Sequence, residues 1–275
     1  MKVVEVYTKK DLDKLTCQGE IVSKVMNDFF KKFPSEYREN YDKNLSCLEI
    51  WKVDETHCGS TSGEYFELLN TMVLRNFNSF VHELMHVASR DNQTGLSAFQ
   101  RMKYVNFCEN ALIEGMTEYL SSFALESSPS DYFFETFAAA MLSNIEGIFE
   151  SYFIPSYDKF VAMFPDKKHI LSIMYALTYY SSKIEEMDEG KIDMIDDNTR
   201  GRVDHSIKDV LDSLIDIQLS MKMGKSANRE YSDKFMELIT SDVMDDCLGM
   251  FSGDYMDYAN EQINKRVLRR IKWVN

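Results

Sequence analysis

The chain has 275 residues, of which 44% are apolar and 28% are charged, a balance that supports a large buried core and excludes general disorder. The 45 acidic and 31 basic residues give a net charge of −14, which argues against nucleic acid as a partner because phosphate binding needs cationic side chains. No stretch of about 20 apolar residues occurs, so we expect no membrane span.

Cysteine usage and the N-terminus bear on the compartment. The five cysteines are odd in number, widely scattered and without a Cys-X-X-Cys pair, which favours reduced thiols. Residues 1–7 lack the long apolar core of a signal peptide. We therefore expect a cytoplasmic protein, with export by a route that needs no N-terminal signal as the alternative.

The first part of the chain predicts a small sheet with one helix. Apolar residues recur at helical spacing through residues 11–33, and Pro34 ends this pattern. Strands are predicted at residues 1–7, 45–53 and 65–74. A turn rich in glycine, serine and threonine at residues 59–63 suggests that the second and third strands form a hairpin.

The segment after this hairpin, residues 79–88, reads SFVHELMHVA. On a helix, His82 and His86 lie four residues apart on one face and can bind a single metal ion, while Glu83 can reach a water beside it. Two imidazoles suit zinc, which lowers the pKa of a bound water to about 7. The pattern therefore predicts the zinc-binding helix of a metallopeptidase.

A short motif also has plainer interpretations, namely a solvated helix face or two core histidines satisfied by backbone carbonyls. The other side chains of the segment are mostly apolar, which predicts a buried helix. Two histidines and a glutamate are costly to bury unless a partner such as a metal ion compensates them. The apolar context therefore favours the zinc site.

A catalytic zinc usually has three protein ligands. A histidine six residues after His86 is one common choice, but Asn92 stands there. A second helix is predicted at residues 109–120, where Glu114 and Glu118 share one face. This helix is the expected source of the third ligand, and its candidates are Glu114, Glu109 and, last, Glu118.

With these two helices the chain resembles the gluzincin zinc peptidases, in which the third ligand is a glutamate on a helix downstream of the HExxH helix. The matching residues are the motif itself, Glu114 with Gly115 after it, and an acid four residues later. The resemblance implies that Glu114 binds zinc and that Glu118 orients His82 or His86. It covers residues 45–122, although this chain has Ile113 where the group often has asparagine and a longer spacing between the two motifs.

The chemistry implied is peptide hydrolysis by a water that zinc activates, with Glu83 as general base and one zinc per chain. A donor from elsewhere must stabilise the developing oxyanion. We assign this catalytic role to His205, which follows Asp204 and opens an amphipathic run. The alternatives are His57, His169, Tyr175, Tyr179 and Tyr180.

The second half of the chain predicts helices only, at residues 131–153, 168–184, 204–222, 229–248 and 254–272. The last of these carries a basic cluster that we expect to pack on the chain's own acidic surface, with an acidic partner as the alternative. We predict an α+β fold with a zincin-like catalytic domain at 1–126, where a small sheet covers the HExxH helix, and a helical domain at 127–275 that completes the active-site cleft.

The sequence thus predicts a zinc metallopeptidase with a peptide or protein substrate. One alternative is a zincin-like helical protein that has lost catalysis and binds a partner. Another is a zinc hydrolase of non-peptide amides. Glu83 argues against the first alternative, because a purely structural zinc needs no general base.

Overall fold

The computed structural model describes residues 3–7, 17–53, 63–74, 79–100, 110–127, 129, 131–186, 196–222 and 255–274. The chain divides into two compact units. The first, here the sheet unit, contains residues 1–105, 117–130 and 146–160, and the second, the helical unit, contains residues 106–116, 131–145 and 161–275. The two units interleave along the chain, and the predicted single domain boundary after residue 126 stays a prediction.

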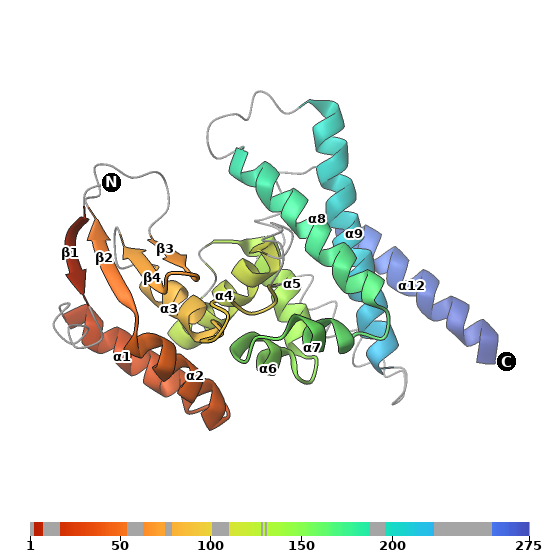
Figure 1. The fold of residues 1–275 in the computed structure, drawn as a ribbon. Coiled ribbons are helices and arrows are strands. Elements are labelled where there is room, and N and C mark those ends of the chain that lie inside the picture. The colour runs from red at the N-terminus through yellow and green to blue at the C-terminus, as the bar shows by residue number, and fades with distance from the viewer. Residues whose placement is uncertain are drawn as a thin grey trace. The chain divides into compact units, whose positions relative to one another are not determined.

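The sheet has the strand order β1-β2-β4-β3, as Figure 1 shows. Strands β1 (Val3–Tyr7) and β2 (Glu49–Val53) are antiparallel, β2 and β4 (Thr71–Leu74) are parallel, and β3 (Gly63–Phe66) pairs antiparallel with β4. Every residue of β4 is buried, as expected for a central strand, whereas β3 is mostly exposed and lies at an edge of the described sheet.

The predicted hairpin between residues 45–53 and 65–74 is wrong. Residues 65–74 are not one strand, because the chain turns after Phe66 and β4 starts only at Thr71. Asn70 closes this turn in the left-handed region (φ 49°), and its side-chain oxygen accepts a hydrogen bond of 2.7 Å from Tyr65. The hairpin is therefore β3–β4, and β2 lies parallel to β4.

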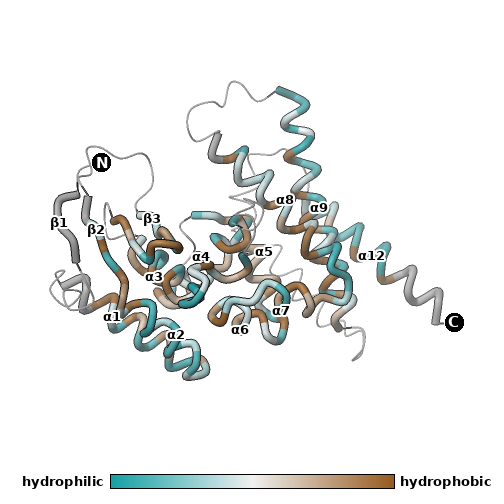
Figure 2. Tube along the Cα trace, viewed as in Figure 1, coloured by the Kyte–Doolittle hydropathy of each residue, from teal (hydrophilic) through white to brown (hydrophobic). Residues whose placement is uncertain are grey.

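Helices α1 (Cys17–Phe30), α2 (Ser35–Ser46), α3 (Phe80–Ala88) and α6 (Ile148–Phe153) belong to the sheet unit, and α3 packs against β3. Helix α2 was not predicted from the sequence, because its buried face consists of two tyrosines, one leucine and one asparagine on an otherwise polar helix. Figure 2 shows α2 mainly in hydrophilic colours and α3 mainly in hydrophobic ones.

Two asparagines of α2 hold the C-terminal end of α3. The Asn44 amide donates to the carbonyls of Val87 (3.0 Å) and Arg90 (2.7 Å), and the Asn40 amide donates to those of Ala88 (3.1 Å) and Arg90 (2.9 Å). The last carbonyls of a helix have no partner within it, and here side chains satisfy them. The polar residues of α2 thus help to position the HExxH helix.

Helix α4 (Asn110–Leu125) is shared: its residues up to Met116 belong to the helical unit, and those from Thr117 on belong to the sheet unit. The helical unit also contains α5 (Phe133–Ser143), α8 (Lys167–Glu186), α9 (Asp197–Lys222) and α12 (Tyr255–Val274), and α9 packs against the other three. Helix α7 (Tyr157–Ala162) spans the change from the sheet unit, which ends at residue 160, to the helical unit, which resumes at residue 161. The described part of the chain contains no helix long and apolar enough to cross a membrane.

The predicted helices of this half are largely present. The helix expected at residues 131–153 is two helices, α5 and α6, separated at Gly147, whose φ of 88° is left-handed. The helix expected at residues 229–248 lies outside the described residues. Arg266 of the basic C-terminal helix pairs with Asp212 (3.1 Å) and Asp216 (2.7 Å) of α9, so this helix does pack on the chain's own acidic surface. The predicted α+β class is confirmed.

A carboxyl group is buried inside the helical unit. Glu135 of α5 is 4% exposed, and Ser181 of α8 donates a hydrogen bond to it. Burial raises the pKa of Glu135 from 4.5 to about 7. Gly115 of α4 lies against the Glu135 backbone, where a Cβ atom would collide with the carbonyl oxygen. The glycine at position 115 therefore lets α4 approach the backbone of α5 closely.

The raised pKa of Glu135 predicts a pH-dependent stability. The folded chain keeps the Glu135 proton up to pH about 7, whereas the unfolded chain releases it near pH 4.5. The parent therefore loses up to about 1.4 kcal/mol of unfolding free energy per pH unit within this window. Glu135→Gln removes the loss, so its stability relative to the parent should rise from pH 4.5 to 7 in urea denaturation. Glu146→Gln, at an exposed position, is the control and should follow the parent. If the unfolding free energies of Glu135→Gln and the parent changed with pH in parallel, the raised pKa of Glu135 would be contradicted.

Candidate metal centre

The two histidines of the HExxH motif belong to α3, and their rings lie close together. Their Nε2 atoms are 3.2 Å apart, and both rings are largely buried, with 13% of the His82 side chain and 5% of His86 exposed. Two Zn–N bonds of ordinary length in a tetrahedral site place the two nitrogens about 3.3 Å apart. The observed separation therefore fits a shared zinc ion.

Glu114 of α4 completes a group of three. The candidate ligand atoms of His82, His86 and Glu114 all lie within 4.8 Å of one another. Among the described residues, no other cluster of three or more histidine, cysteine or acidic side chains has this compactness. Glu109, the alternative third ligand, lies outside the described residues.

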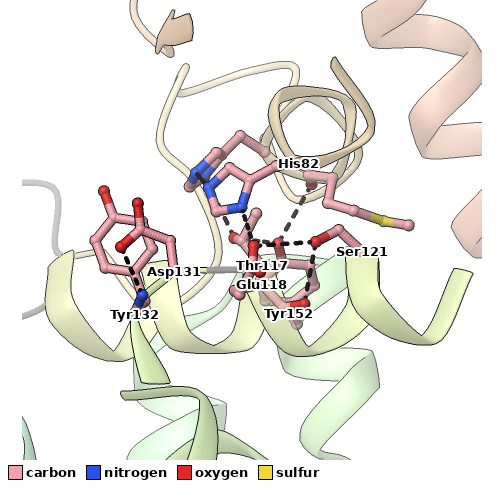
Figure 3. A network of polar contacts seen from close by, with 9 residues as sticks. His82, Thr117, Glu118, Ser121, Asp131, Tyr132 and Tyr152 are labelled. Atoms are coloured by element: carbon pink, nitrogen blue, oxygen red, sulfur yellow. Dashed lines mark hydrogen bonds and ion pairs between the residues drawn. The ribbon is translucent and has the colours of Figure 1, made fainter. Parts of the chain in front are cut away.

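Glu118 lies one turn after Glu114 on α4 and faces His82. Its Oε2 atom is 2.9 Å from His82 Nδ1, and Ser121 donates to the same carboxylate oxygen at 3.4 Å (Figure 3). A proton on Nδ1 that points to Glu118 leaves Nε2 of His82 free for a metal. Of the two histidines that the sequence analysis allowed for Glu118, the structure places it against His82.

His86 has a different neighbour on its Nδ1 side. The hydroxyl of Thr117 lies 3.4 Å from His86 Nδ1 and 2.7 Å from the Tyr152 hydroxyl, which donates to the Met85 carbonyl at 3.3 Å. Figure 3 shows Thr117 and Tyr152 beside Glu118. The sequence analysis missed both residues. The spacing of Thr117, three residues after Glu114 on the same helix, was a usable signal, whereas nothing in the sequence pointed to Tyr152.

Glu83 is 5% exposed and lies against the start of strand β3. A Cβ atom added to Gly63 would lie 3.0 Å from Glu83 Oε1 and 2.6 Å from Ser79 Oγ. Both distances are shorter than ordinary van der Waals contact. A side chain at the first position of β3 would therefore displace Ser79 or the Glu83 carboxylate, and glycine avoids this.

Of the other candidate residues, the two histidines of α8 and α9 and the three tyrosines of α8 lie in the helical unit. His205 of α9 has 76% of its side chain exposed and pairs with Asp209 at 3.5 Å, while His169 of α8 lies 4.0 Å from Asp166. His57 lies outside the described residues. The catalytic role of His205 stays a prediction.

The three tyrosines of α8 differ in their surroundings. Tyr175 is 60% exposed, Tyr180 is buried against Phe134, and the Arg202 guanidinium lies over the Tyr179 ring. None of these contacts favours one tyrosine as an oxyanion donor.

Comparison with protein-family models, curated proteins and solved structures finds no match to this chain. The resemblance to gluzincins therefore rests on the residues of the two motifs alone and stays a prediction.

The geometry predicts the ligand set directly. The parent chain should bind about one zinc, Glu114→Ala should lose it because one of three protein ligands is gone, and Glu83→Gln should keep it. Plasma mass spectrometry of desalted protein measures the metal content. Glu109→Ala is the control that should keep zinc, and loss of zinc in Glu109→Ala with retention in Glu114→Ala would contradict the assignment.

Proposed function

We propose that the chain is a zinc-dependent peptidase, with His82, His86 and Glu114 as the metal ligands and Glu83 as the general base. The observation that carries the proposal is the 3.2 Å separation of the two Nε2 atoms, with a carboxylate oxygen of Glu114 within 4.8 Å of them. A site with three protein ligands leaves a position open for catalysis, whereas structural zinc sites are usually closed by four. A catalytic role therefore accounts for this donor set better than a structural one.

When bound, zinc supplies a Lewis acid that polarises a carbonyl group and activates water. Glu83 supplies the proton transfer: its carboxylate accepts the proton of the attacking water and passes it to the leaving amine. Glu118 keeps His82 in the tautomer and orientation in which Nε2 is free. Low exposure of Glu83 and His86 keeps bulk water away from both groups, which strengthens their electrostatic effect.

The edge strand β3 supports a peptide as the substrate. Its first residue, Gly63, touches Glu83, and its outward residues Glu64 and Phe66 are exposed. An extended peptide that pairs with such an edge makes main-chain hydrogen bonds irrespective of its sequence, and here it would run past the general base. A small non-peptide amide makes no use of this strand.

Loss of the general base should separate binding from catalysis. Glu83→Gln keeps the size of the side chain but removes its basicity, so peptide cleavage should fall by about 10²- to 10⁴-fold while zinc stays bound. Mass spectrometry of a peptide mixture incubated with each zinc-loaded variant measures the cleavage. Equal cleavage by the parent and Glu83→Gln would reject the peptidase mechanism, and the absence of cleavage in both would favour the partner-binding alternative.

Gly63→Ala tests the contact between β3 and the base. The new methyl group must displace Glu83 or Ser79, so kcat should fall roughly 10- to 100-fold with zinc content unchanged. Gly201→Ala on α9, where no heavy atom lies within 4 Å of the added carbon, is the matched control and should keep full activity. An unchanged kcat in Gly63→Ala would show that this contact does not position Glu83.

A further inference from the structure

We infer that Thr117 and Tyr152 are positioning residues that set the tautomer and orientation of His86 through a directed chain of hydrogen bonds, an inference that rests on the proposed zinc site. The chain runs from His86 Nδ1 to Thr117 Oγ1 (3.4 Å), from there to the Tyr152 hydroxyl (2.7 Å), and ends at the Met85 carbonyl (3.3 Å). All four residues belong to the sheet unit.

The donor and acceptor of each hydrogen bond follow from the role of His86. If Nε2 of His86 binds the metal, the proton of the neutral ring sits on Nδ1, which then donates to Thr117 Oγ1. The Thr117 hydroxyl proton is left to donate to Tyr152, and the Tyr152 hydroxyl donates to the Met85 carbonyl. Each hydroxyl accepts one bond and donates one, so only one ring tautomer satisfies the whole chain.

Burial makes this arrangement hard to replace. Thr117 and Tyr152 are both 0% exposed, so bulk water has no access to substitute for a missing hydroxyl. These hydrogen bonds connect α4, α6 and α3 and end at Met85, the residue that precedes His86. The imidazole and the backbone next to it are therefore held by the same two side chains.

The two zinc ligands of α3 then differ in their support. His82 faces a carboxylate, Glu118, whereas His86 faces a neutral hydroxyl. A carboxylate partner raises the basicity of an imidazole more than a hydroxyl does. The hydroxyl chain therefore contributes mainly orientation to His86, and its loss should weaken zinc binding without removing a ligand.

Zinc affinity, measured by competition with a chromophoric chelator, tests the inference. Thr117→Val keeps the shape of the side chain and removes the hydroxyl, so zinc should bind about 10- to 100-fold more weakly. Tyr152→Phe should weaken zinc binding less, because Thr117 still faces His86. Since Tyr152 acts largely through Thr117, the affinity loss of the double variant should be smaller than the sum of the two single losses, and Thr117→Ser should restore the parent affinity.

Two control variants separate this effect from a general loss of stability. Thr136 is buried, and its hydroxyl has no hydrogen-bond partner, so Thr136→Val should leave zinc affinity unchanged. Tyr255 is buried and donates to Asp204 at 2.9 Å, so Tyr255→Phe removes a similar hydroxyl in the helical unit and should also leave the affinity unchanged.

Three outcomes would overturn the inference. The first is a zinc affinity of both Thr117→Val and Tyr152→Phe within twofold of the parent affinity. The second is a double variant whose loss of zinc affinity is the sum of the two single losses. Either result, obtained while the parent binds zinc, leaves the proposed peptidase intact and rejects only the positioning role. The third is a parent chain that binds no zinc, which rejects the proposed function and the inference together.

Discussion

Burial of two imidazoles whose Nε2 atoms point at one position is the constraint on which the rest of the site depends. Each ring needs a partner on its Nδ1 side, because an unsatisfied polar atom in the interior costs about 1–3 kcal/mol. Glu118 serves His82 and Thr117 serves His86. Both partners come from the same helix, α4, which also brings Glu114 toward the ring nitrogens. A single helix therefore supplies one candidate ligand and the support for the other two.

The rest of the sheet unit holds this arrangement in place. The amides of Asn40 and Asn44 satisfy the last carbonyls of α3, and Tyr152 of α6 ties the Met85 carbonyl to Thr117. At the N-terminal end of α3, Gly63 lets strand β3 approach Glu83 without a side chain between them. Three polar side chains and one glycine thus position α3, as the preorganised site that we propose requires.

The sequence predicted what is local and missed what is formed by the fold. Helices α3 and α4 follow from spacings of three and four residues, and so does the position of His82 and His86 on one helix face. The choice of Glu114 as candidate third ligand came from the resemblance to the gluzincins. Helix α2 was missed because its buried side chains are tyrosine and asparagine rather than aliphatic residues. The parallel β2–β4 pair was missed because the turn at Asn70 divides residues 65–74. Tyr152 and Gly63 act on residues far away in the sequence, where no spacing rule applies.

X-ray absorption spectroscopy at the zinc edge of the zinc-loaded parent chain tests most directly whether these residues form a catalytic zinc centre. The account predicts four-coordinate zinc with two imidazole nitrogens and a carboxylate oxygen, all at about 2.0–2.2 Å. In Glu114→Ala the carboxylate contribution should disappear while the imidazole signal of any remaining zinc persists. Zinc with sulfur ligands at about 2.3 Å, or without imidazole scattering, would contradict the assignment of His82 and His86 as ligands.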